Sequence, residues 1–499
     1  MDSHYPQDPT PEEPEVGAAE GFLSRRTLLK AGVGALGLSA STLTALTVLA
    51  RTPNRMAAAR PHGPLPEIQY DISDYIAPAR TIDGVVFRFG PVYTLFVTAR
   101  LTRRPTHQEQ VIMEEALRTI EAAYEFSPKG IFTTISYGLP YFKRLARNVV
   151  AGHMPRLLTD RTRVALEEAV PGPTDIAPQN PGISKLKYNV PVVIEENDVL
   201  LTLRSDELSH LYDVIAWLKG SNELTGRRVP SPAFNGLLLF TSERLMFVQI
   251  GLPRQLANTN SLAYASHINP HSPMWMGFAD QQVSGSGAAT CTAFQGDASA
   301  RFTDTHKGDY FFNGSIQHLS HVIQDLAQFY AADEPYTERC QYMFRSNPIP
   351  SKGNKDQYAN GGGPAFLENI YQGTHDALHN AEAIHTYQGE HRMGHISALQ
   401  RSSRGADGKP AHIRADGPGF DSMDVPDGSS QPKLQFSIFV PTAEFFAQLR
   451  KNQAALDLVN RYQVQDDDNG LERFITATRR QNFLVPPRAH RSFPLLELS

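Results

Sequence analysis

The chain has 499 residues, of which 41% are hydrophobic and 20% charged, and its formal net charge is −5. This is the composition of an ordinary globular protein, and the sequence has no basic stripe with interleaved aromatics, so we expect no nucleic-acid partner. Two cysteines, Cys291 and Cys340, exclude a disulfide-dense scaffold and a four-cysteine metal site. Either one bridge or two thiols fits that number.

The first segment of the chain is acidic and polar. Residues 1–23 contain several prolines and many acidic side chains and cannot bury a core, so we predict that they are disordered.

An export signal is predicted at residues 24–59. The pair Arg25-Arg26 precedes an uncharged stretch, 31–50, and small residues at 57–59 offer a cleavage site, which is the arrangement of a twin-arginine (Tat) signal. We therefore expect the Tat machinery as a partner and a periplasmic or extracellular protein. A retained membrane anchor is the alternative, because the cleavage site lies beyond the apolar run.

A linker at residues 60–84 leads to the first predicted domain, 85–265. Residues 85–103 are rich in Val, Phe, Tyr and Thr and predict one long or two short strands. A helix should follow, because Thr106 and Glu109 have the spacing of a capping box.

A second strand and helix are predicted further along this domain. Residues 199–203 form an apolar run, Ser205 is the predicted N-cap, and apolar residues recur at helical spacing until Gly220. Two more strands are predicted at 237–240 and 245–250. Strands alternating with amphipathic helices indicate helices packed on a sheet, an arrangement of the α+β or α/β kind.

The second predicted domain covers residues 266–490. Apolar side chains from Val322 to Tyr330 predict one helix face, and those from Phe445 to Val459 predict another. Residues 346–364 and 402–433 are rich in Gly, Pro, Asp and Ser and predict long loops. His412 lies in the second of these, where functional residues tend to collect, and the alternative is a solvent-exposed loop histidine.

Two short motifs in this domain are candidates for chemistry: Gly277-Phe278-Ala279-Asp280 and Ala411-His412-Ile413-Arg414. Together with the segment from Gly308 to Ser320, they resemble the dye-decolourising (DyP-type) haem peroxidases. The resemblance implies an α+β fold with two ferredoxin-like halves, whose antiparallel sheets form a barrel and whose second half holds the cofactor.

The resemblance also implies roles for the motif residues. His412 would bind the iron of haem b, and Arg414, Gly277 and Phe278 would contact the cofactor. Asp280 would take a proton from hydrogen peroxide and return it to the leaving oxygen. An organic reductant would then be the second substrate, and a homo-oligomer is left open.

The sequence departs from the family pattern at two places. Gln281 stands where the family has a glycine directly after the first motif, which we call the distal motif. The run 415–446 contains no arginine where the family carries one. Its one basic residue, Lys433, is a candidate to replace that arginine in part, and an arginine from elsewhere in the chain is another. Because arginine stabilises negative charge on a peroxide oxygen, the alternative function is haem binding with weak or lost peroxidase activity.

A different metal site is suggested by a cluster of histidines. The cluster comprises His375, His379, His385, His391 and His395. Two of its pairs have i, i+4 spacing, which places both rings on one helix face, as zinc and copper sites require. A non-haem metal-binding protein is therefore a third hypothesis.

Overall fold

The computed structural model describes residues 64–78, 80–82, 85–87, 90–270, 272–277, 288–296, 302–331, 339, 342–343, 394–395, 410–456 and 470–499. The predicted disordered segment and export signal, at residues 1–59, lie outside these ranges. Over the described ranges, the search for a helix of membrane-crossing length and hydropathy finds none.

The N-terminal half is a ferredoxin-like unit. Its elements in chain order are β3 (Tyr93–Leu101), α3 (His107–Ala123), β4 (Phe132–Gly138), β6 (Val199–Ser205), α6 (Leu208–Leu218) and β9 (Leu238–Phe247). The strands lie in the order β4-β6-β3-β9, and every neighbouring pair is antiparallel. This is the β-α-β-β-α-β path of the ferredoxin-like motif.

Local sequence explains both helices of this half. The capping box at α3 is confirmed, because the Glu109 amide donates to Thr106 Oγ1 at 3.3 Å and the Thr106 amide donates to Glu109 Oε2 at 2.9 Å. The predicted N-cap of α6 is wrong: Ser205 ends β6, and Glu207 is the N-cap. Ser205 Oγ instead accepts from the Glu207 amide and donates to the Gly130 carbonyl, so it closes the turn before the helix.

The C-terminal half repeats the same neighbour order. It contains β10 (Ser315–Gln324), α8 (Leu326–Phe329), β11 (Ile413–Arg414), β12 (Gly417–Asp421), β13 (Gln431–Val440), α14 (Ala443–Ala454) and β14 (Ile475–Val485). Both β11 and β12 pair with β13, which is followed by β10 and β14. Val322 and Ile323 belong to β10 and not to a helix, so the helix predicted there is wrong over its first turn.

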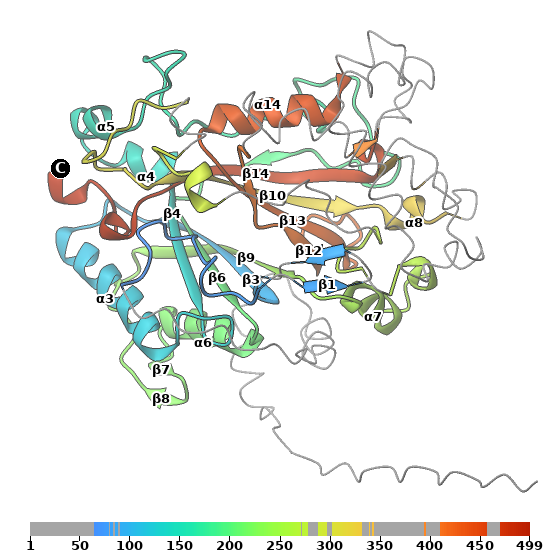
Figure 1. The fold of residues 1–499 in the computed structure, drawn as a ribbon, viewed down its shortest axis with the longest axis horizontal. Helices are drawn as coiled ribbons and strands as arrows, with labels where there is room; N and C mark the ends of the chain where they lie inside the picture. The colour runs from blue at the N-terminus through green and yellow to red at the C-terminus, as the bar shows by residue number, and fades with distance from the viewer. Residues whose placement is uncertain are drawn as a thin grey trace, which may run out of the picture. The chain divides into compact units, whose positions relative to one another are not determined.

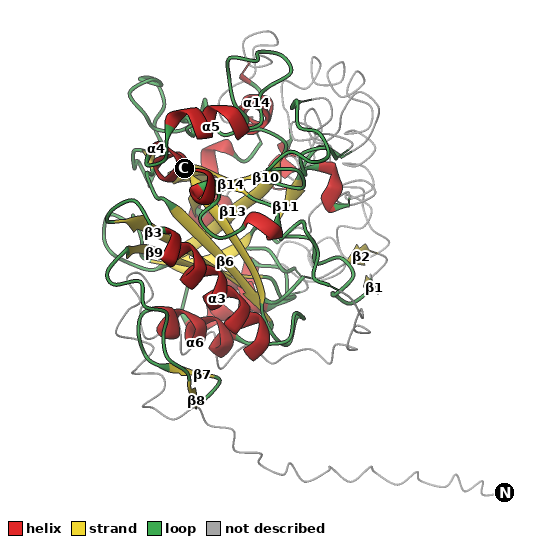
Figure 2. Ribbon diagram, turned by 90° about the vertical axis from the view of Figure 1, so that its left-hand side faces the viewer, coloured by secondary structure: helices red, strands yellow, loops and turns green. Residues whose placement is uncertain are grey.

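The two halves share one sheet that curls on itself. β14 pairs with β4 through Phe483 opposite Gly138, and the helices α3, α6 and α14 lie outside the strands (Figures 1 and 2). Inside, a cluster draws buried side chains from both halves: Phe96, Leu200, Met246, Leu319 and Phe483. The predicted α+β class with two ferredoxin-like halves is confirmed, whereas the boundary at 265/266 stays a prediction.

The described part of the chain also contains shorter strands and α-helices. They are β1 (Arg80–Ile82) paired with β2 (Val85–Phe87), α4 (Leu139–Lys143), α5 (Arg147–His153), β5 (Val193–Ile194) beside β14, β7 (Glu223–Leu224) paired with β8 (Arg227–Arg228), and α7 (Leu252–Thr259).

Candidate functional site

The Ala-His-Ile-Arg motif begins with two buried residues, Ala411 and His412, and continues into a half-buried strand. Residues 410–433, predicted as loop, contain β11, β12 and the start of β13. His412 directly precedes β11 and is 1% exposed, so the interpretation as a solvent-exposed loop histidine is wrong. The pairing of Ile413 with Phe439 of β13 explains the difference, because a Gly- and Pro-rich segment can still form an edge strand when a long partner strand is present.

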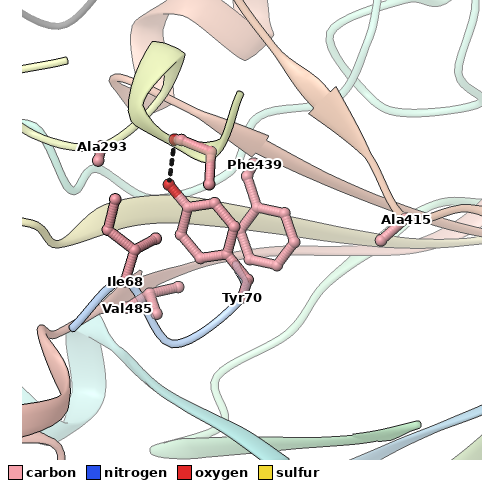
Figure 3. Packing of buried hydrophobic residues seen from close by; sticks show 7 residues of the cluster. Ile68, Tyr70, Ala293, Ala415, Phe439 and Val485 are labelled. Carbon is pink, nitrogen blue, oxygen red and sulfur yellow. Dashed lines mark hydrogen bonds between the residues drawn. The ribbon is translucent and has the colours of Figure 1, made fainter. Parts of the chain in front are cut away.

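Residues of the predicted linker, 60–84, pack against the face of β11 that carries Ile413. Tyr70 stacks on Phe439 with ring centroids 4.0 Å apart, in a cluster that includes Ala415 (Figure 3). The partly buried Ile413 packs against the same cluster. The Tyr70 hydroxyl lies 2.9 Å from Thr292 Oγ1. The segment 64–78 therefore packs against the face of β11 that carries Ile413, at the end of the sheet.

Strand register places Arg414 on the outer face of the sheet. Arg414 lies opposite Ile438, which lies opposite His318 on β10. The His318 ring stacks on Phe446 of α14 at 3.5 Å, so this face is the one that the helix covers. Since alternate residues of an extended strand share a face, we expect His412 to lie on this face as well.

The distal motif is described only at its first residue. Gly277 has φ +80°, a left-handed conformation that favours glycine. Phe278, Asp280 and Gln281 lie outside the described residues. The separation of Asp280 from His412 therefore stays a prediction.

Lys433 occupies the opposite, interior face of the sheet. Its Nζ donates to the Met423 carbonyl at 2.7 Å and lies 3.5 Å from Asp421 Oδ1, and its side chain is 0% exposed. Gln435, two residues on, also contacts Asp421. Burial lowers the pKa of Lys433, although Asp421 and Asp424 act against this. Lys433 and Arg414 therefore lie on opposite faces of the sheet.

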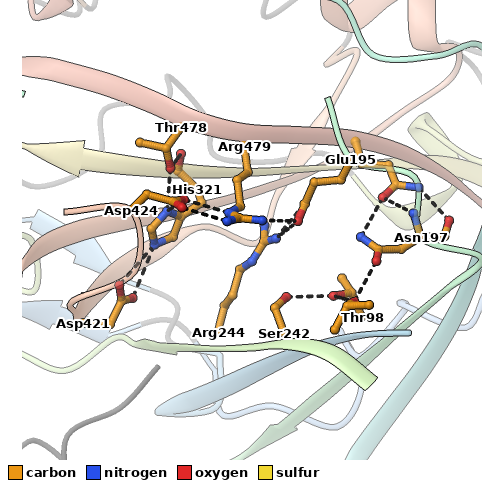
Figure 4. Close-up of polar contacts among 12 residues, drawn as sticks. Thr98, Glu195, Asn197, Ser242, Arg244, His321, Asp421, Asp424, Thr478 and Arg479 are labelled. Carbon is orange, nitrogen blue, oxygen red and sulfur yellow. Dashed lines mark hydrogen bonds and ion pairs between the residues drawn. The ribbon is translucent and has the colours of Figure 1, made fainter. Parts of the chain in front are cut away.

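Lys433 lies at one end of a buried ionic chain, a row of linked ion pairs on the interior face of the sheet. The sequence alone did not predict this chain. Arg244 donates to Glu195, Glu195 also accepts from Arg479, and Arg479 pairs with Asp424 through two 2.7 Å bonds (Figure 4). His321 continues the chain, with Nε2 3.3 Å from Asp421 and Nδ1 3.6 Å from Asp424.

Charges compensate one another along this chain. Arg244, Arg479 and Lys433 face the carboxylates of Glu195, Asp421 and Asp424, so the charges of these six side chains cancel. Burial acts to raise the pKa of Asp421, but His321 and Lys433 lower it below its ordinary value. The sequence signal was the presence of charged residues within strands, such as Arg244 in β9 and Arg479 in β14. Only the pairing of segments distant in sequence could show that these residues meet.

The outer face carries a second buried network. Arg480 pairs with Asp175 at 2.6 Å and donates to Ser320 Oγ at 2.8 Å. His318 lies between Ser320 and Asn482, with 2.6 Å contacts at both ring nitrogens. A neutral ring satisfies both contacts, because Nδ1 donates to the Asn482 carbonyl oxygen and Nε2 accepts from the Ser320 hydroxyl. Burial and the charge of Arg480 hold the pKa of His318 well below its ordinary value.

The histidine cluster is described at one residue. His395 Nδ1 lies 3.3 Å from Gln453 Nε2, and the other four histidines lie outside the described residues. Within the described ranges, no group of three or more His, Cys, Asp and Glu side chains is arranged to hold a metal ion. Cys340 also lies outside, so the question of a bridge to Cys291 stays open.

The imidazole of His412 has the chemistry of a haem ligand. His412 is buried directly before a strand whose other face is packed, and the imidazole nitrogen of histidine is a common ligand of haem iron. Arg414 follows His412 by two residues, and its side chain is 11% exposed. Arg414 Nε lies 3.9 Å from Asp416 Oδ1. A guanidinium in that position suits the carboxylates of a haem.

The chain is an α+β protein of two ferredoxin-like halves, with a buried histidine next to the strand at one edge of its 10-stranded sheet. The chain belongs to a family of unknown function, DUF7405, whose model matches residues 91–487. No curated protein matches the sequence.

Solved structures that resemble the chain include three bacterial proteins. They are a Rhodococcus jostii DypB variant in complex with heme (11% identity, TM-score 0.45, 80% of this chain and 95% of that one), the encapsulated DyP-type peroxidase of Mycobacterium smegmatis (13%, 0.42, 81% and 96%) and a dye-decolorizing peroxidase of Bacteroides thetaiotaomicron (13%, 0.41, 80% and 94%). Identities this low transfer no residue role.

Proposed function

We propose that this protein is a haem-dependent peroxidase of the DyP type. The observation that carries the proposal is the burial of His412, which removes the simplest alternative for the Ala-His-Ile-Arg motif. The two ferredoxin-like halves agree with the fold that the motif implies. Haem b, when bound, would supply the iron at which hydrogen peroxide is reduced to water and an organic donor is oxidised.

Each motif residue has a stated role in this proposal. His412 holds the cofactor through a neutral imidazole nitrogen, while Arg414, Gly277 and Phe278 contact it. Asp280 moves a proton from one peroxide oxygen to the other, so that water can leave.

A second candidate function is haem binding with slow peroxide turnover. The interior position of Lys433 favours it, because the run after His412 then offers no cation at the peroxide. We also propose export through the Tat machinery, with the protein periplasmic, extracellular or tethered by an uncleaved signal. Replacement of Arg25 and Arg26 by lysine should then keep the protein in the cytoplasm.

The first experiment is a visible absorption spectrum of the protein purified with haem supplied, before and after addition of hydrogen peroxide. A Soret band that changes within seconds supports the peroxidase. A Soret band indifferent to peroxide supports the haem-binding alternative. Absence of the band overturns both, and metal analysis of the histidine cluster follows.

The ligand assignment is tested separately. His412→Gly should lose the Soret band and regain it when imidazole is added, because free imidazole can occupy the vacated position. His210→Ala, on α6, is the control for loss of a histidine and should keep the band. A His412→Gly protein that retains haem without imidazole contradicts the assignment.

A further inference from the structure

Arg204 is a cation on the interior face of the first ferredoxin-like half. It is the last residue but one of β6, and two earlier residues at alternate positions of this strand face the inside of the barrel. Leu200 belongs to the core cluster that both halves share, and Thr202 Oγ1 accepts a hydrogen bond from Gln317 of β10. Because side chains of a strand alternate between its two faces, Arg204 points to the interior as well.

The guanidinium of Arg204 lacks the acidic partner that other buried arginines of this protein have. Arg244 pairs with Glu195, and Arg480 pairs with Asp175. Burial lowers the pKa of Arg204 to about 10, and no carboxylate of a described residue acts against this. Its Nε is buried without a hydrogen-bond partner in the described part of the chain. An unpaired charge taken out of water is costly, so this position calls for an anion.

Thr94 offers a second unused polar group beside Arg204. The two residues lie opposite each other in the antiparallel pair of β3 and β6, so their side chains are neighbours on the interior face. Thr94 is 0% exposed, and none of the described residues forms a hydrogen bond with its Oγ1. Water can satisfy a hydroxyl, whereas only an anion neutralises a guanidinium. One anion between these two side chains would satisfy both.

Gly90 determines how the guanidinium lies. A Cβ built on Gly90 would be 2.6 Å from Arg204 Nη2, which is closer than the two atoms can approach. The backbone at residue 90 is therefore packed directly against the guanidinium. Any residue with a side chain at this position would displace the guanidinium from its place beside Thr94.

We propose that Arg204 and Thr94 bind the carboxylate group of a small organic acid, at a site separate from the proposed haem site. The planar guanidinium matches a carboxylate through two parallel hydrogen bonds, and the Thr94 hydroxyl donates a third. The nitrogen and oxygen atoms involved are all contributed by neighbouring strands of one sheet, so their spacing is fixed by strand pairing.

Charge and surroundings favour a carboxylate over a phosphate. The site has one unmatched positive charge, which a single carboxylate neutralises, whereas a phosphate group near neutral pH carries more negative charge than that. Phe132 lies opposite Arg204 on β4, and Met246 lies opposite Thr94 on β9. Both are buried and apolar, so they offer no further cation for a second negative charge.

Acetate is the probe for this site. Denaturant unfolding at pH 7 should show that acetate stabilises the protein relative to chloride at equal ionic strength. At ten times the Kd, the equilibrium constant for folding should rise about tenfold. Arg204→Met should lose this response and, in chloride, should be at least as stable as the unmodified protein. Arg118→Met is the matched control and should keep the response, because Arg118 is exposed and pairs with Glu114 on α3.

Two further variants test the geometry and leave the charge in place. Thr94→Val should weaken acetate binding about three- to tenfold and should change stability in chloride little, since its hydroxyl loses no partner there. Gly90→Ala should keep the fold, because the new methyl meets only the end of a flexible side chain, and should lose the acetate response. Gly152→Ala is its control, since no atom lies within 4 Å of that Cβ.

Three results would overturn the proposal. Equal stabilisation of the unmodified protein and Arg204→Met by acetate would mean that acetate does not act at Arg204. An Arg204→Met protein that is less stable by the same amount in chloride and in acetate would mean that a group of the chain already neutralises the arginine. Stronger stabilisation by inorganic phosphate than by acetate at equal concentration would contradict the carboxylate assignment.

Discussion

Lys433 is held inside the barrel through its ammonium group, which contacts the Met423 carbonyl and the Asp421 carboxylate. From sequence, it was the one basic residue in the run where an arginine is expected, and so a candidate for that role. Its environment indicates a structural role instead, because it neutralises Asp421 at the end of the buried ionic chain. Whether a lysine faces the interior or the outer side of a strand depends on register, which the sequence alone does not specify.

Lys433→Met should destabilise the protein and leave its reaction with peroxide unchanged. Loss of the ammonium leaves Asp421 with less compensation in a buried position, at a cost of about 3 kcal/mol in the free energy of unfolding. Denaturant unfolding and the peroxide rate should be measured together. Lys143→Met, whose partner Glu168 is equally exposed, should change stability by less than about 1 kcal/mol. A folded Lys433→Met protein that reacts slowly would place Lys433 at the site.

At the scale of elements, local signals predicted some boundaries well and others poorly. The capping box at α3 and the apolar run of β6 depend on neighbours in sequence, and both were found from sequence. β12 was read as loop because Gly417, Pro418 and Gly419 have low strand propensity. Its formation depends on β13 and on close approach to β9, and neither is a local property.

Gly419→Ala tests the approach of β12 to β9. A Cβ at Gly419 would lie 2.9 Å from the Leu245 carbonyl oxygen and 3.0 Å from Gln435 Nε2, so β12 must move. The expected loss is about 1–3 kcal/mol in the free energy of unfolding, measured by denaturant titration. Gly182→Ala is the control, because no atom lies within 4 Å of its Cβ. Equal stability of the two variants would show that β12 can relax away from β9.

At the scale of the whole molecule, the sheet carries a buried ionic network on each face. The interior chain connects β9 of the first half to β10, β12 and β14 of the second, and the outer network connects β10 and β14 to the segment before β6. Fold class could be predicted from sequence motifs, whereas the role of His412 stays a prediction. The networks could not be predicted, because each joins residues more than a hundred positions apart, such as His318 with Asn482.

These networks give the stability of the protein a defined pH dependence. His318 has a pKa well below its ordinary value in the folded state, so below about pH 6.5 the unfolded chain binds a proton that the folded protein does not. The free energy of unfolding should therefore fall as pH decreases from that point, by at most about 1.4 kcal/mol per pH unit for this group. Asp175, Glu195 and Asp421 have lowered pKa values, so the stability they contribute is complete above about pH 5 and is lost as pH falls further.

Denaturant unfolding between pH 8 and pH 4 separates the two contributions. His318→Gln should be less stable at pH 8, since the stacking on Phe446 is lost, but its stability should decline less between pH 6.5 and pH 5. The decline below pH 5 should persist, because Asp175 and Arg480 remain. An identical slope in both proteins above pH 5 would mean that His318 is protonated in the folded state, and that the Ser320 and Asn482 contacts accommodate an imidazolium.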